Sequence, residues 1–124
     1  MAALDQATLD LLAEQVEVDM ITPRSDGSLS RRPIWAVVVD GEAYVRSYLG
    51  ERGAWYQRVL ADGKASIGLD DRTIDVATEP EHGEEINRKI SDAFYAKYSG
   101  SSPGPTEAMV SPEVTATTLR LTTA

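Results

Sequence analysis

Residues 34–49 have the sequence IWAVVVDGEAYVRSYL, which is the clearest structural signal in the chain. The first part, Ile34 to Val39, is apolar at odd and even positions alike and rich in β-branched residues, which is typical of a strand covered on both faces. Asp40-Gly41 is a strong signal for a two-residue turn. The stretch therefore predicts a β-hairpin whose second strand covers Glu42–Leu49.

Alternating or β-branched runs on either side of this hairpin predict four further strands. They are a strand that begins near Val16 and stops at Pro23, a hairpin formed by Lys64–Leu69 and Arg72–Ala77, and a final strand at Val114–Leu121. The turn of the second hairpin contains Asp70-Asp71, which we interpret as turn residues without a chemical role.

Three helices are expected around these strands. The first covers the amphipathic segment Leu4–Glu14, with Asp5 as its N-cap, and the second covers Ala54–Ala61. A third helix is expected to open at Thr78-Glu79-Pro80-Glu81, which resembles a capping box, and to stop near Gly100, with Ser99–Pro105 as a loop. Six short strands joined by tight turns, with three peripheral helices, indicate a mainly β (α+β) antiparallel barrel or strongly coiled sheet.

The composition limits the function classes. With 124 residues, the chain is expected to form one domain, 1–124. Its 12 Lys and Arg against 20 Asp and Glu give a net charge of −8, which opposes binding to nucleic acid or anionic membranes. The absence of cysteine and of a second histidine beside His82 argues against a metal site. Without a cationic leader or a long apolar run, the expected location is the cytoplasm.

The positive charge is concentrated in the middle of the chain. Residues 21–60 contain six arginines and four acidic residues, whereas both ends of the chain are acidic. Guanidinium groups suit bidentate recognition of phosphate or carboxylate, so this cluster favours a small anionic ligand. The alternative is that these arginines form ordinary surface ion pairs with the acidic ends.

A candidate ligand site lies in the second half of the first hairpin. If Glu42–Leu49 is a strand, Tyr44, Arg46 and Tyr48 share one face, which could hold a flat anionic cofactor. Gly50, Gly53 and the following helix start could bind phosphate through backbone N–H groups, with Arg31 and Arg32 converging from the preceding strand. The tyrosines could instead form a cross-strand aromatic cluster, and for Trp35 and Trp55 core packing is the preferred interpretation.

The order of these residues resembles the split β-barrel superfamily, which includes pyridoxamine-phosphate-oxidase-like flavoproteins and deazaflavin-dependent nitroreductases. The resemblance covers roughly residues 22–76. It is carried by Thr22-x-Arg24, the Gly27 turn, Arg32-Pro33-Ile34-Trp35, Val45-Arg46-Ser47, Gly50-x-x-Gly53 and the segment that begins Trp55-Tyr56-Gln57-Arg58.

The resemblance implies a six-stranded split barrel that binds FMN or a deazaflavin (coenzyme F-420) and transfers a hydride to or from a small organic substrate. The residues that would line the cofactor site are Arg32, Arg46, Ser47, Arg52 and Trp55. If Arg46 binds the cofactor, its replacement by alanine should abolish affinity with little loss of stability. The alternative is a cofactor-free binding or structural domain whose aromatic face packs against a second copy of the chain.

Overall fold

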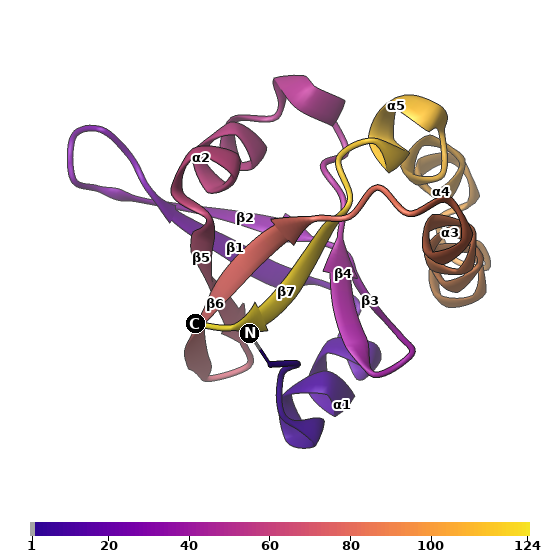
Figure 1. Cartoon of the computed structure of the whole chain (residues 1–124), viewed down its shortest axis with the longest axis horizontal. Coiled ribbons are helices and arrows are strands. Elements are labelled where there is room, and N and C mark those ends of the chain that lie inside the picture. The colour runs from indigo at the N-terminus through magenta and orange to yellow at the C-terminus, as the bar shows by residue number, and fades with distance from the viewer. Residues whose placement is uncertain (1) are drawn as a thin grey trace.

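The computed structural model describes residues 2–124, which form a curled antiparallel sheet with helices around it (Figure 1). The strands are β1 (Val18–Pro23), β2 (Leu29–Ile34), β3 (Ala36–Val39), β4 (Glu42–Val45), β5 (Lys64–Leu69), β6 (Arg72–Pro80) and β7 (Leu119–Thr123). The helices are α1 (Gln6–Glu14), α2 (Ala54–Asp62), α3 (Glu84–Tyr98), α4 (Pro103–Met109) and α5 (Pro112–Thr115), with a 3₁₀ turn, η1 (Gly50–Arg52), before α2.

The sheet has the strand order β2-β1-β5-β6-β7-β4-β3, so β2 and β3 are its two edges although they are neighbours in sequence. All of its strand pairs are antiparallel. Helices α3, α4 and α5 lie together on one side, α2 lies across the sheet from them, and α1 lies at one end (Figure 1). This arrangement is an antiparallel half-barrel, as the sequence predicts, but with seven strands rather than six.

The structure confirms the turn of the predicted first hairpin and the burial of its first strand on both faces. Asp40 and Gly41 have φ values of 51° and 78°, the left-handed conformation of the two-residue hairpin turn. Ala36 and Val38 pack into the core inside the curled sheet, whereas Val37 and Val39 pack into a second core between the sheet and α3. The strand is therefore covered on both faces, which explains its unbroken apolar sequence.

Several predicted strand boundaries are wrong. The first hairpin strand begins at Ala36 rather than Ile34, because Ile34 is the last residue of β2. The second hairpin strand ends at Val45 rather than Leu49, so Tyr48 lies outside the sheet and is 55% exposed. The final strand begins at Leu119, because the start of the predicted Val114–Leu121 run belongs to α5 and the turn after it.

The strand that the sequence does not predict is β2. Its sequence, LSRRPI, is polar and contains Pro33. Proline cannot donate a ladder hydrogen bond, and a strand tolerates it mainly at a sheet edge, which is where β2 lies. β2 forms a hairpin with β1, in which Val18 pairs with Ile34 and Pro23 pairs with Leu29.

The predicted helix start at Thr78 is also wrong. Thr78, Glu79 and Pro80 extend β6 and pair with β7, and α3 begins at Glu84 with Gly83 as its N-cap. The local capping pattern is overridden because pairing with β7 satisfies the backbone groups of this segment.

The expected loop Ser99–Pro105 is shortened by α4, whose first residue is Pro103. None of the helices among residues 2–124 has the length and apolar character needed to cross a membrane.

Lys97 on α3 joins three elements of the fold. Its Nζ donates to the carbonyl oxygens of Leu12 in α1, at 2.8 Å, and of Ala36 in β3, at 2.7 Å. The ammonium also lies 5.1 Å from the ring centroid of Tyr98. Because no carboxylate of residues 2–124 forms an ion pair with it, burial lowers the pKa of Lys97 to about 8.

The buried Lys97 predicts a pH-dependent stability. Between about pH 8 and 10.5 the unfolded chain holds a proton on this amine that the folded protein has lost, so the free energy of unfolding should rise with pH across this window. Urea unfolding at several pH values should show this rise relative to Lys97→Met, which has no titrating amine. Parallel curves for the two proteins would contradict the expectation.

Candidate functional site

A cavity of about 270 Å³ opens where the link between β2 and β3, the loop after β4 and the starts of α2 and α4 meet. It is lined by Glu17, Pro33, Ile34, Trp35, Arg46, Tyr48, Trp55, Pro105 and Met109. Most of this wall is apolar or aromatic, with one buried cation, which is the usual character of a small-molecule site.

Three aromatic side chains line the cavity. Trp35 stacks on Tyr98 with ring centroids 3.8 Å apart and planes 2° from parallel, which fixes the orientation of its indole ring. Trp55 lies in the first turn of α2, is 9% exposed and packs edge-on against Tyr56. The preferred sequence interpretation of both tryptophans, core packing, is confirmed, because each packs in or against a hydrophobic core while it also lines the cavity. Flat rings of this kind suit a flat aromatic ligand.

Arg46 is 1% exposed, and its guanidinium is fully hydrogen-bonded inside the protein. It donates from Nε to Thr118 Oγ1 at 2.9 Å, from Nη1 to Ser91 Oγ at 2.9 Å and the Met109 carbonyl at 3.0 Å, and from Nη2 to the carbonyl and side-chain oxygens of Asn87 at 3.1 and 3.2 Å. A guanidinium has five N–H groups, so each has an internal acceptor.

These contacts change the interpretation of Arg46. Tyr44 and Arg46 both lie on the α3 side of the sheet, where Tyr44 packs in the second core and the Arg46 Cζ lies 5.3 Å from the Phe94 ring centroid. Tyr48 does not join them, because the strand has ended, so the predicted face of two tyrosines around an arginine does not form. The expectation that Arg46 can be removed with little loss of stability is corrected by its five internal hydrogen bonds.

Ser47 also has an internal role. Its Oγ donates to the Gly50 carbonyl at 2.7 Å, and its backbone N–H donates to Thr117 Oγ1 at 2.9 Å. A Cβ added to Gly53 would lie 2.3 Å from Ser47 Oγ, so the loop closes tightly only because residue 53 is glycine. Ser47 therefore shapes the loop that carries Tyr48 but does not line the cavity.

The remaining predicted arginines are separated. Arg32 is exposed and directly precedes Pro33 and Ile34, which line the cavity. Arg31 faces a different hollow and forms an ion pair with Asp19 at 3.3 Å, and Arg52 lines a third hollow with Glu51 and Glu113. The structure thus brings Arg46 and Trp55 together at one cavity. Arg32 adjoins the lining residues in sequence only, and Ser47, Arg52 and Arg31 do not line the cavity.

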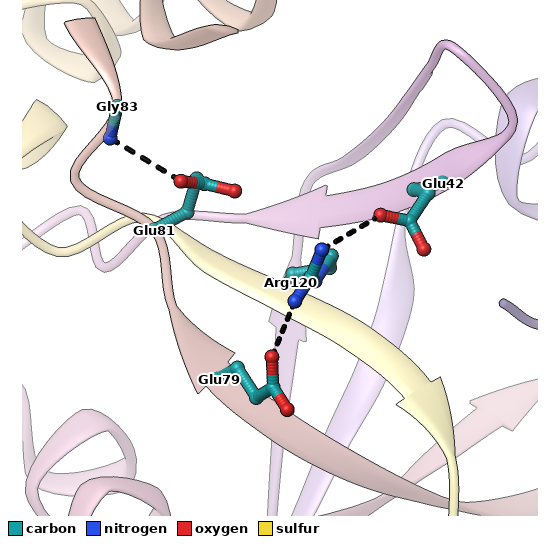
Figure 2. Close-up of polar contacts among 5 residues, drawn as sticks. All are labelled: Glu42, Glu79, Glu81, Gly83 and Arg120. Carbon is teal, nitrogen blue, oxygen red and sulfur yellow. Dashed lines mark hydrogen bonds and ion pairs between the residues drawn. The ribbon is translucent and has the colours of Figure 1, made fainter. Parts of the chain in front are cut away.

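The sequence analysis also missed an ion-pair cluster around a second arginine. Arg120 on β7 forms ion pairs with Glu42 on β4, at 3.1 Å, and with Glu79 on β6 (Figure 2). Glu81, further along the chain after β6, accepts a hydrogen bond from the Gly83 backbone and does not pair with the arginine (Figure 2). The two carboxylates raise the pKa of Arg120 above its usual value. No local signal could reveal this cluster, because it depends on β7 pairing with both neighbours.

Comparisons with known proteins agree with this geometry at the level of the fold. A family model described as "Uncharacterized protein conserved in bacteria (DUF2255)" matches residues 8–121. The curated proteins searched contain no significant match.

Solved structures with similar folds have very different sequences. A conserved hypothetical protein, Rv2991 from Mycobacterium tuberculosis, is similar with a TM-score of 0.68 at 15% identity, over 97% of this chain and 79% of that one. An F420-H2 dependent reductase, FDR-A, gives 0.61 at 17% identity over 98% of each chain. HutZ, described as a heme storage protein from Vibrio cholerae, gives 0.67 at 11% identity over 98% of this chain and 91% of that one. At these identities the similarities establish the split-barrel fold alone.

The contacts of Arg46 predict that this residue is essential for stability. Arg46→Ala should lower the free energy of unfolding by about 3–5 kcal/mol, because it leaves several buried acceptors without donors and removes packing. Arg88→Ala, which removes an exposed arginine of α3, should change it by no more than about 0.5 kcal/mol. Chemical denaturation of both variants measures the difference, and equal effects would show that the Arg46 hydrogen bonds contribute little.

Proposed function

The chain belongs to the DUF2255 family and has the split-barrel fold, and from this premise we propose that it is an oxidoreductase that binds FMN or a deazaflavin in the cavity between Trp35, Tyr48 and Trp55. The observation that carries the proposal is the cavity itself, in which three aromatic side chains and a buried cation line one space. A neighbour in fold, FDR-A, is described as dependent on F420-H2, which is consistent with a cofactor of this class.

The size of the cavity fits the ring of such a cofactor. Its volume of about 270 Å³ is close to the lower limit of roughly 300 Å³ for small-molecule pockets, so a ring system can enter but a ribityl phosphate tail cannot. The tail would remain outside the cavity, and the exposed Arg32, which directly precedes the lining residues Pro33 and Ile34, is the candidate to pair with its phosphate. The only histidine, His82, lies at a different hollow, so the cavity offers no imidazole for an iron ligand.

The candidate residues differ in their roles in this proposal. Trp55 and Trp35 contact the ring and exclude water, Arg46 forms part of the wall, and Ser47 holds the loop that places Tyr48 at the cavity. Arg52 lies at another hollow and has no role in ring binding. A flavin or deazaflavin supplies hydride transfer when bound, and the chain supplies orientation and an apolar surface. The substrate would be a small organic molecule.

The neighbouring residues Arg31 and Arg32 give a matched test. Arg32→Gln should weaken binding of FMN by about tenfold, the loss of one charge-assisted contact, whereas Arg31→Gln, which alters the other hollow, should not. Lumiflavin, which has the ring without a phosphate, should bind both variants like the wild type. Fluorescence titrations with FMN, lumiflavin and a deazaflavin measure these affinities. Lack of saturable binding of all three to the wild type would end the oxidoreductase proposal.

A cofactor-free domain that pairs with a second copy is the other candidate. It is favoured by two adjacent exposed side chains, Tyr48 at the cavity and Leu49 next to it in sequence, which are 55% and 59% exposed. In that case the melting temperature should rise with protein concentration, and Tyr48→Ser with Leu49→Ser should abolish this dependence. Scanning calorimetry over a wide concentration range measures it, and a constant melting temperature would exclude this alternative.

A further inference from the structure

The charge of Arg46 has no internal counter-ion. All five of its hydrogen bonds go to neutral acceptors, which come from Asn87 and Ser91 of α3, Met109 of α4 and Thr118 before β7. Within residues 2–124 no carboxylate forms an ion pair with it. Burial lowers the pKa of Arg46 to about 10, so the guanidinium still carries its charge at neutral pH.

Arg46 and Glu17 are the two charged residues that line the cavity, and their surroundings differ. Glu17 is exposed, so water and salt weaken its field, although its charge adds to the effect of burial in raising the pKa of Tyr98, which stacks on Trp35. Arg46 is 1% exposed and the rest of the lining is mainly apolar, so the lower dielectric constant around it strengthens electrostatic interactions. The cavity is therefore expected to have a positive potential, although the protein as a whole has a net charge of −8.

We infer that the cavity selects planar aromatic ligands in their anionic form, and that Arg46 acts through its electric field rather than by donating a hydrogen bond to the ligand. The inference extends the proposed function, because it states which charge state of a ring the site prefers. It assigns the selectivity to a residue whose N–H groups are already occupied. Exposed arginines such as Arg32 would instead select an anion through contacts that salt weakens.

Two nitroaromatic probes of nearly equal size test this inference with the wild-type protein. Equilibrium dialysis is carried out with 4-nitrophenolate and neutral 4-nitroaniline, at a pH at which the phenol is ionised. It should show at least about tenfold tighter binding of the anion. The ratio should change less than about twofold between 0.05 and 0.5 M salt, since the charge of Arg46 is buried. Equal affinities, a ratio that falls to one at high salt, or binding of neither probe would overturn the inference.

Variants identify the responsible residue. Arg46→Gln should reduce the ratio to about one, whereas Arg88→Gln, which removes an exposed arginine of the neighbouring helix, should leave it unchanged. If Arg46→Gln does not fold, the salt series on the wild type still decides between a buried and an exposed charge. The two proposals fail separately: probes that discriminate without any flavin binding would refute the cofactor, and flavin binding with non-discriminating probes would refute the role of Arg46.

Discussion

The buried guanidinium of Arg46 connects the end of β4 to α3, α4 and the residue that precedes β7. Its five N–H groups satisfy oxygens that would otherwise be buried without a donor where these elements meet. A desolvated cation is costly, and the hydrogen bonds together with the Phe94 ring offset that cost without a carboxylate. Arg46 thus links α3 and α4 to the end of β4 beside one wall of the cavity.

The same residue links stability to the candidate function. Because the strand ends at Val45, the chain turns after Arg46 and carries Tyr48 outward, while Ser47 and Gly53 hold the loop in a tight path. The loop then leads into α2, whose first turn places Trp55 opposite the link that contains Trp35. The cavity with its aromatic side chains and Arg46 in the lining is thus a consequence of how the loop closes around a structural arginine.

Local patterns predicted the elements whose structure is determined by neighbouring residues. Asp5 caps α1 through a hydrogen bond from the Thr8 backbone, Asp40-Gly41 forms the predicted turn, and the alternation in Lys64–Leu69 marks a strand. Prediction failed where distant pairing decides, as in the edge strand around Pro33 and in the extension of β6 through Thr78. For the site, Trp55 was placed at the cavity, but the contacts of Arg46 come from residues 41 to 72 positions later, beyond any local pattern.

The sequence by itself determined the hairpin of residues 36–45, the short helix after the glycine pair, the antiparallel class of the sheet and a concentration of arginine in an acidic chain. Each of these depends on side-chain periodicity, turn chemistry or composition, which are local or additive properties. The tertiary structure decided which arginine is buried, which is exposed and which aromatic rings share a cavity, because burial and hydrogen-bond partners depend on contacts between segments far apart in the chain.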